Sequence, residues 1–188
     1  MPIPFARVLF WIIELVLVLG IFGYCFYITG LFLSMLFEVP YVPSNLKAVR
    51  EAFAFIRARP NMKLIELGCG DGRVLCTVAK EYGLQGKGID LNPVLITIAK
   101  VRALAMGVSK RVQFFRTNAR DANLKEADIL YVFMLPKFLN SEQISQKIKE
   151  DLRPGTHVIS HWYEIDHLKS KQVHKLTIDN HNTYIYTI

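Results

Sequence analysis

A glycine-rich segment, residues 65–73, is the part of this sequence best able to do chemistry. It reads IELGCGDGR and follows a short apolar run, which predicts a turn between a strand and a helix. Glycines let the backbone turn sharply and approach a ligand without a Cβ clash. Asp90 lies 22 residues after Gly68, at the predicted end of the next strand, where a carboxylate can accept hydrogen bonds from both ribose hydroxyls. Together these features predict a nucleoside site.

The acidic residues of this segment indicate which nucleoside it binds. The glycine spacing is G-x-G-x-G rather than G-x-G-x-x-G, with Asp71 inside the turn and Glu66 just before it. These carboxylates would repel a pyrophosphate at the start of the following helix and attract a cation. S-Adenosylmethionine carries a sulfonium, an ammonium and a ribose but no phosphate, so we expect it as the cofactor. A glycine turn that binds nothing is disfavoured, because the turn, Asp90 and the strand–turn–helix context occur together.

Strand and helix patterns alternate along most of the chain and place this turn at one edge of a sheet. Such alternation predicts an α/β fold with a Rossmann-like, doubly wound, mostly parallel seven-stranded sheet, and a ligand crevice at the carboxyl ends of its strands. The last two strands flank a polar turn at 179–182 and form an antiparallel edge. The predicted strands span residues 63–67, 86–90, 112–116, 129–134, 157–162, 172–178 and 183–188; the predicted helices span 44–57 (capped by Ser44), 73–82, 93–106 and 141–152 (capped by Ser141).

An uncharged run, residues 15–37, precedes this domain and predicts one transmembrane helix. As a helix it would be roughly 34 Å long at ~1.5 Å per residue, enough for a hydrocarbon core of ~30 Å. Trp11 and Glu14 would lie at one interface. A signal peptide is disfavoured because the run is too long and lacks a small residue before Cys25. We therefore expect an anchor at 1–38, a proline-containing linker at 39–44, and one catalytic domain over 39–188.

Charge and cysteine content limit the partners. The net charge is +7, and the first 38 residues hold one arginine and two glutamates, so the domain carries +8. Anionic lipid and nucleic acid both suit a basic domain, but the charges are dispersed beside an apolar segment, which favours lipid and disfavours nucleic acid. Lys47, Arg50 and Arg57 outnumber Arg7 and the terminal amine, which predicts a domain facing the cytoplasm. The three scattered cysteines indicate neither a disulfide framework nor a metal site, and Cys69 is expected as a small residue in the turn.

Two sets of motifs resemble a known family. Residues 66–73 and 88–93 resemble class I S-adenosylmethionine-dependent methyltransferases. Residues 40–44, 133–136 and 154–161 add a narrower resemblance to the small protein-lysine methyltransferases that modify the mitochondrial adenine nucleotide translocase and the ATP synthase c-subunit, and to their prokaryotic relatives. Members of that group can carry an N-terminal hydrophobic segment. The resemblance also implies an alternative location, the mitochondrial inner membrane.

The resemblance implies specific contacts with S-adenosylmethionine. The segment 41–43 would fold over the cofactor, and Asp90 would hold its ribose. Asn118 stands where many members have an aspartate for the adenine amine, and an amide can still accept that hydrogen bond. Residues 133–136 would border the reacting methyl group, although core packing explains Phe133 and Met134 equally well. The implied cofactor residues are Tyr41, Val42, Pro43, Glu66, Gly68, Cys69, Gly70, Asp71, Gly72, Asp90, Leu91, Asn92, Asn118, Ala119, Phe133 and Met134.

Methyl transfer to lysine requires a neutral amine, whose ordinary pKa is near ~10.4. Desolvation in an aromatic channel lowers that pKa, so no strong base is required. The candidates for the channel are Pro136, His161, Trp162 and Tyr163. His161 is a possible base, but a structural histidine is the commoner role of such a residue.

Three functions stay open at this point. The absence of an Asn/Asp-Pro-Pro-Tyr motif after the fourth strand disfavours methylation of nucleobases and glutamine. The resemblance favours a membrane-anchored enzyme acting on the ε-amine of a protein lysine, with a membrane-associated protein as partner. The alternatives are a methyltransferase for a membrane lipid or quinone, and a non-catalytic cofactor-binding module.

Overall fold

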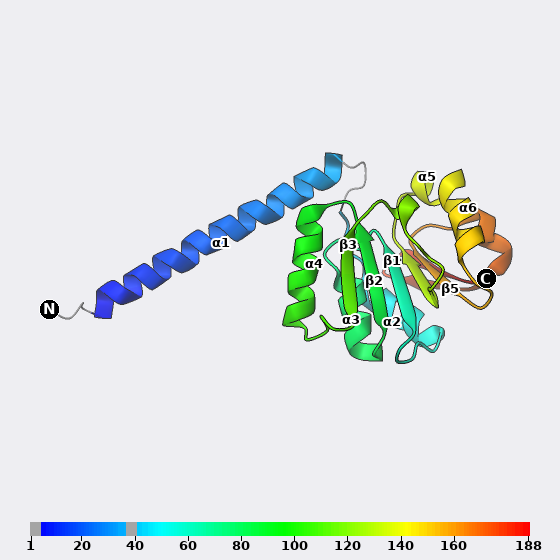
Figure 1. Ribbon diagram of the computed structural model, residues 1–188, viewed down its shortest axis with the longest axis horizontal. Helices are drawn as coiled ribbons and strands as arrows, with labels where there is room; N and C mark the ends of the chain where they lie inside the picture. Colours follow the sequence, from blue (N-terminus) through cyan, green and yellow to red (C-terminus); the bar gives the residue numbers. More distant parts are fainter. Residues whose placement is uncertain (1–4, 37–40) are drawn as a thin grey trace.

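The structure, a computed structural model, describes residues 5–36 and 41–188 (Figure 1). Three predicted features therefore lie outside the described residues. They are the end of the uncharged run at Phe37, the boundary between residues 38 and 39, and the first two linker residues, Val39 and Pro40.

A seven-stranded sheet with the order β3-β2-β1-β4-β5-β7-β6 forms the centre of the domain. Neighbouring strands are parallel from β3 to β5, while β7 is antiparallel to both β5 and β6. The order reverses between β1 and β4, where a ligand crevice is expected at the carboxyl ends. The predicted sheet is confirmed. Its strands are β1 Lys63–Leu67, β2 Gln85–Asp90, β3 Val112–Arg116, β4 Ile129–Val132, β5 His157–His161, β6 Gln172–Ile178 and β7 His181–Thr187.

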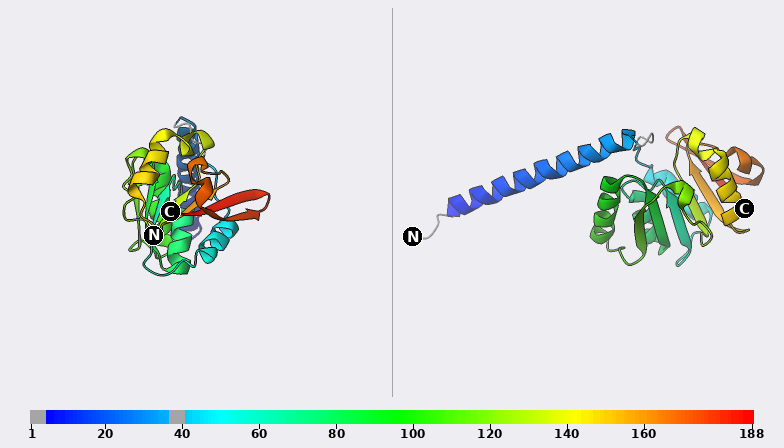
Figure 2. Two further views of the ribbon diagram at one scale, coloured as in Figure 1. Left: turned by 90° about the vertical axis from the view of Figure 1, so that its right-hand side faces the viewer. Right: turned by 45° about the horizontal axis from the view of Figure 1, so that its top comes forward.

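Helices cover both faces of the sheet, as the alternating pattern predicts (Figure 2). Helices α2 (Leu46–Phe55), α3 (Arg73–Tyr82) and α4 (Pro93–Ala105) pack on one face. Helix α6 (Glu142–Asp151) and two 3₁₀ helices, η1 (Ala119–Asp121) and η2 (Asp166–Lys171), pack on the other. A single-turn helix, α5 (Pro136–Leu139), follows β4 and has no counterpart in the predicted elements.

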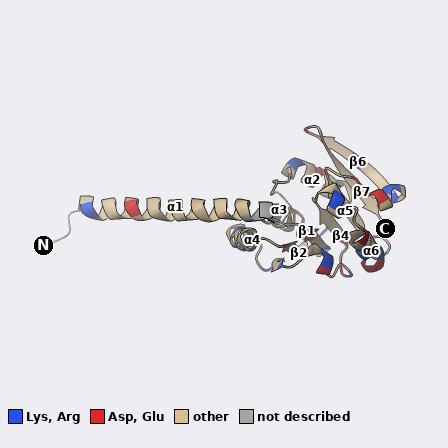
Figure 3. Ribbon diagram, turned by 90° about the horizontal axis from the view of Figure 1, so that it is seen from above, with Lys and Arg blue, Asp and Glu red and all other residues tan. Residues whose placement is uncertain are grey.

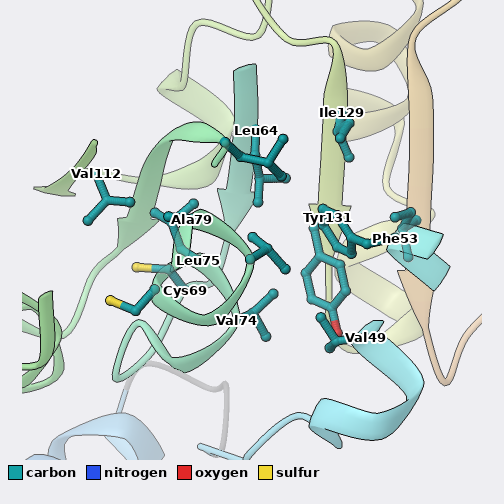
Figure 4. Packing of buried hydrophobic residues seen from close by; sticks show 14 of the residues in the cluster. Val49, Phe53, Leu64, Cys69, Val74, Leu75, Ala79, Val112, Ile129 and Tyr131 are labelled. Atoms are coloured by element: carbon teal, nitrogen blue, oxygen red, sulfur yellow. The ribbon is translucent and has the colours of Figure 1, made fainter. Parts of the chain in front are cut away.

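Apolar side chains from alternate strand positions fill both layers. Figure 4 shows the first layer, where Leu64 of β1 and Tyr131 of β4 pack between Leu75 of α3 and Phe53 of α2. All four side chains are almost fully buried. Because β1 and β4 are held in this packed layer, the turns that follow their carboxyl ends start from fixed positions.

Several element ends differ from the predicted ones for local reasons. Asn45, rather than Ser44, caps α2, because its Oδ1 accepts the N–H of Lys47 at 2.9 Å. Ser141 stands at the N-cap position of α6, but its hydroxyl donates to the carbonyl oxygen of Phe138 instead. The turn between β6 and β7 needs only residues 179 and 180, which both have positive φ (50° and 63°), so β7 begins two residues before its predicted start.

Helix α1 (Phe5–Leu36) projects from the domain beside α4 (Figures 1 and 3). It begins ten residues before the uncharged run, and its segment Phe5–Gly30 is long and apolar enough to cross a membrane. The carbonyl oxygen of Gly30 accepts a 2.7 Å hydrogen bond from Nδ2 of Asn92. A Cβ at Gly30 would come within 2.5 Å of Cγ1 of Val94, so only glycine permits this close contact between α1 and α4.

Candidate active site

A cavity of about 390 Å³ lies at the carboxyl ends of β1, β2 and β4, where the strand order reverses. Its size falls within the ~300–1,000 Å³ typical of small-molecule sites. The structure brings the predicted site residues together there, with three exceptions: Gly72, Pro136 and His161. The predicted residues that line the cavity are Tyr41, Val42, Pro43, Glu66, Gly68, Cys69, Gly70, Asp71, Asp90, Leu91, Asn92, Asn118, Ala119, Phe133, Met134, Trp162 and Tyr163.

The glycine turn is built as its sequence requires. Gly68, Gly70 and Gly72 have φ values of 73°, 50° and 71°, in the left-handed region that favours glycine. A Cβ at Gly70 would lie 2.9 Å from the ring of Tyr41, which closes over the turn from the linker. A Cβ at Gly72 would lie 2.7 Å from Cβ of Ala99 in α4, so Gly72 permits close packing of two helices and does not face the cavity.

Asp71 is neutralised by two arginines, which corrects the electrostatic prediction. Arg73 Nε and Nη2 donate to its two carboxylate oxygens at 3.0 and 2.9 Å, and Arg102 Nη2 of α4 donates to Oδ2 at 2.6 Å. Burial alone would raise the pKa of Asp71, but the hydrogen bonds and charge of Arg73, together with Arg102, hold that pKa below its usual value. The loop therefore lacks the surplus negative charge that its sequence indicates.

Phosphate is still disfavoured at this turn, but for a different reason. Oε2 of the buried Glu66 accepts the N–H of Leu75 at 3.2 Å, and Oδ1 of Asp71 accepts the N–H of Arg73 at 3.1 Å. Two of the first three backbone donors of α3 are thus occupied by carboxylates of the chain, and those donors are what a pyrophosphate would need. Burial raises the pKa of Glu66 well above its ordinary value, while the hydrogen bond from Leu75 opposes that rise.

Asp90 ends β2 and faces the cavity, as predicted. Its Oδ2 accepts the N–H of Gly70 at 2.9 Å and its Oδ1 accepts the N–H of Asn92 at 2.8 Å. Each carboxylate oxygen has two acceptor positions, so both oxygens can also accept a ribose hydroxyl. Burial raises the pKa of Asp90, while the hydrogen bonds from Asn92 and Gly70 oppose that rise. Asn92 in turn caps α4 through Oδ1 and contacts Gly30 through Nδ2, so it links Asp90 to α1.

The predicted adenine contact, Asn118, lies just before η1. Asn118 Oδ1 accepts the N–H of Arg120 at 3.0 Å and keeps a second acceptor position for an adenine amine. Leu91 and Ala119 also line the cavity. Arg120 also lines it and lies over the ring of Phe138 at 4.8 Å.

Several aromatic side chains close one end of the cavity. This end follows β4 and β5, whereas Asp90 lies at the other end, where β2 ends. Phe133 makes edge contacts with Trp162 and with His161, each at 4.9 Å between ring centroids. Trp162 has φ of 73° and lines the cavity with Tyr163. His161 lies behind Phe133, fully buried, with Nδ1 2.7 Å from the hydroxyl of Thr183. Burial lowers the pKa of His161 to about 4, and nearby His181 contributes to the shift, so His161 is neutral at pH 7 and has no access to the cavity.

Several lining residues were not among the predicted ones. Pro136 starts α5 and does not belong to the lining, whereas its neighbours Leu135 and Lys137 do. The sequence could have indicated Arg73 through the D-G-R triplet, which places a charged residue at the start of the helix after the glycine turn. The lining residues missed are Ser44, Arg73, Val74, Ile89, Leu95, Thr117, Arg120, Lys137, Phe138 and Ser141.

These residues fit S-adenosylmethionine. Gly68 and Gly70 line the cavity without side chains, Asp90 offers acceptors to a ribose, and Phe133 with Met134 provides an apolar surface on the other side of the glycine turn. A sheet of this strand order, with a glycine turn after β1 and an acid at the end of β2, defines a class I S-adenosylmethionine-dependent methyltransferase.

Comparison with known proteins identifies the family within this class. Residues 66–172 match the ANTKMT methyltransferase domain. A protein-lysine N-methyltransferase from Saccharolobus islandicus (strain REY15A) is 32% identical over 154 residues, which cover 80% of this chain and 94% of the relative. The chain therefore belongs to the ANTKMT family of S-adenosylmethionine-dependent protein-lysine N-methyltransferases, and the predicted resemblance is confirmed.

Other relatives agree with this assignment. The adenine nucleotide translocase lysine N-methyltransferase of Mus musculus is 32% identical, and the Xenopus laevis lysine N-methyltransferase named for the ATP synthase c-subunit is 28% identical. Each match covers 65% of this chain and 52% of the relative, so the chain spans about half their length. Among solved structures, an RNA methyltransferase from Salinibacter ruber in complex with S-adenosyl-L-homocysteine has a TM-score of 0.73 and 26% identity, covering 78% of this chain and 94% of that one.

Proposed function

We propose that α1 anchors this chain in a membrane and that the enzyme methylates the ε-amine of a lysine in a membrane protein, close to the bilayer. One observation carries the proposal. Asn92, which lines the cavity, is hydrogen-bonded to Gly30 at the end of the apolar segment of α1. An anchor fixed so close to the cavity holds the active site near the membrane surface, where such a lysine would be presented.

Each part of the cavity has a distinct role in this proposal. Asp90 accepts hydrogen bonds from the ribose, Asn118 and Leu91 contact the adenine, and the turn at 68–70 lies against the remaining chain of the cofactor. S-Adenosylmethionine, when bound there, supplies an electrophilic methyl carbon on a sulfonium. Phe133 and Met134 exclude water beside that carbon, and Trp162 with Tyr163 orients the incoming side chain.

The acceptor lysine must lose its proton before it can react. The aromatic residues remove water from the approaching ammonium, which lowers its pKa. Lys137 also lines the cavity, and repulsion between its positive charge and the ammonium of the acceptor lowers the pKa of the acceptor further. Of the described histidines none lines the cavity, so proton loss to solvent during entry replaces a dedicated base in this scheme.

Names of relatives support the choice of substrate class. Two relatives are named for lysine methylation of adenine nucleotide translocase and of the ATP synthase c-subunit, and a third for protein-lysine methylation. The segment after β4 reads Phe133-Met134-Leu135-Pro136 and offers no side-chain hydrogen bonds for a planar base. We place the domain on the cytoplasmic side, in line with Lys47, Arg50 and Arg57; a mitochondrial inner membrane is the alternative.

Labelling of intact membranes tests the proposal. Membranes lacking the enzyme are incubated with the full chain and S-adenosylmethionine tritiated in the methyl group. We expect label in a membrane protein that yields methyllysine on acid hydrolysis, and much less label with the Asp90→Ala variant when the cofactor concentration is limiting. Label in the solvent extract would indicate the lipid or quinone alternative, and label in RNA would indicate a nucleic-acid substrate; either result contradicts the proposal.

A further inference from the structure

Helix α4 has an exposed face that the described residues leave uncovered. Thr97, Lys100, Val101, Leu104 and Ala105 are all exposed and recur at the i, i+3, i+4 spacing of one helix face. Val101 is 60% exposed and Leu104 is 68% exposed, although both are large aliphatic residues. We call these five residues the α4 face. Its apolar centre suits contact with a nonpolar or amphipathic surface.

The chain around the α4 face has an unusual charge distribution. Between Asp90 and Asp121 it contains no acidic residue but six basic ones. The rest of the domain mixes both signs. Arg102 is engaged by Asp71, whereas Lys100 and Lys110 form no ion pair with any described residue. This stretch therefore presents positive charge next to exposed aliphatic side chains. The six residues are Lys100, Arg102, Lys110, Arg111, Arg116 and Arg120.

The α4 face lies on the side of the domain from which α1 projects. Gly30 of α1 contacts Asn92 and Val94, at the start of α4. Figures 1 and 3 show α4 as the outermost element of the domain on that side. A bilayer that surrounds α1 would thus be adjacent to the α4 face, which makes the lipid surface continuous with the anchor.

We infer that the α4 face and its neighbouring basic residues bind the surface of an anionic phospholipid bilayer. The aliphatic residues Val101 and Leu104 enter the interfacial layer, and the unpaired Lys100 and Lys110 contact anionic headgroups. The inference rests on the proposed anchoring by α1. It adds a second contact that fixes the orientation of the domain against the membrane.

This orientation determines where the cavity opens. Leu91, Leu95, Thr117, Asn118 and Arg120 line the cavity and belong to the same acid-free stretch. With the α4 face on the lipid, that rim lies beside the headgroups. An acceptor lysine then reaches the site from a membrane protein at the level of the bilayer surface.

Fluorescence quenching by lipid nitroxides tests the inference with the full chain. An environment-sensitive fluorophore is attached at position 104 of a Leu104→Cys, Cys25→Ser variant, in which the two remaining native cysteines, Cys69 and Cys76, are buried. The matched control is Val173→Cys in the same background, since Val173 is 51% exposed on β6 at the opposite edge of the sheet. Fluorophore on the native Cys25, exposed in α1, reports the anchor itself. Vesicles contain phosphatidylcholine with or without phosphatidylglycerol, and carry nitroxides either near the headgroups or deeper in the acyl chains.

We expect quenching at position 104, and at Cys25 with deeper nitroxides, but none at position 173. Quenching at 104 should weaken without phosphatidylglycerol. The double variant Lys100→Glu, Lys110→Glu should abolish this quenching while leaving affinity for S-adenosylmethionine unchanged.

Quenching at Cys25 but not at 104 overturns the lipid contact and leaves the anchor intact. Absence of quenching at Cys25 overturns the anchoring, and the inference with it. Shielding at 104 that requires an added membrane protein instead of lipid also overturns it.

Discussion

Arg102 of α4 places its Nη2 2.6 Å from Oδ2 of Asp71, which lies 31 residues earlier in the turn after β1. The Asp71 side chain is only 6% exposed, so the ion pair is largely shielded from water. It joins the cofactor turn to the helix that contacts α1. The turn is thus held by α4 as well as by its own glycines.

We predict that Asp71→Asn lowers the free energy of unfolding by about 1–3 kcal/mol, because two arginines lose a charged partner. Thermal unfolding of the detergent-solubilised full chain measures this change. Asp166→Asn is the matched control, since Asp166 is 62% exposed and pairs with Lys169 on the surface. An equal effect of both substitutions would contradict the structural role of Asp71.

The same pair predicts a dependence on pH. The folded-state pKa of Asp71 is lowered, so its ionised form contributes stability above the unfolded value of about 3.9. That contribution is lost as the pH falls through the lowered folded value. Asp71→Asn should therefore flatten the stability profile below about pH 4 and leave its slope between pH 6 and 8 unchanged. An unchanged slope below pH 4 would contradict the assignment.

Asp90→Ala should weaken binding of S-adenosylmethionine by roughly 10- to 100-fold, as expected for loss of hydrogen bonds to a charged acceptor at ~1.5–3 kcal/mol. Isothermal titration calorimetry with S-adenosylmethionine measures the affinity. Glu81→Gln serves as the control, because Glu81 pairs with Arg50 away from the cavity. Unchanged affinity in Asp90→Ala would remove Asp90 from the binding site.

His161→Asn should retain the shape of the pH–rate profile, because His161 lies behind Phe133 and does not reach the cavity. Asparagine can keep the hydrogen bond to Thr183. The dependence of stability on pH, in contrast, should change. The folded pKa of about 4 is below the unfolded value of about 6.5, so wild-type stability is lost as the pH falls from 6.5 to 4, and the variant lacks this loss. Disappearance of a pH–rate inflection in the variant would instead identify His161 as the base.

Lys137→Glu should raise the pH at which the rate reaches half its maximum, because a carboxylate in the lining stabilises the ammonium form of the acceptor lysine. Lys137→Met should give a smaller shift in the same direction. Both variants should keep wild-type affinity for the cofactor, which separates this effect from loss of the site. A profile that does not move in either variant would contradict the role given to Lys137.

Some parts of the site could be predicted from the sequence alone, and others could not. The glycine turn and Asp90 were predictable because local rules control them: left-handed φ at Gly68 and Gly70 requires glycine, and the end of a parallel strand places an acid at the crevice. The partners of Asp71 were not predictable in the same way. Arg102 reaches it only through the packing of α3 against α4, in which Gly72 contacts Ala99.

The sequence by itself determined the alternating α/β order, the apolar N-terminal helix and the family motifs, since hydrophobic period, glycine geometry and strand connection are properties of neighbouring residues. Tertiary structure alone decided which charges in the site are neutralised and which aromatic side chains face the cavity. Neutralisation of Asp71, burial of Glu66 and His161, and the contact of Gly30 with Asn92 each join residues from separate elements. Their distances depend on how the helices pack on the sheet, and no local pattern records that packing.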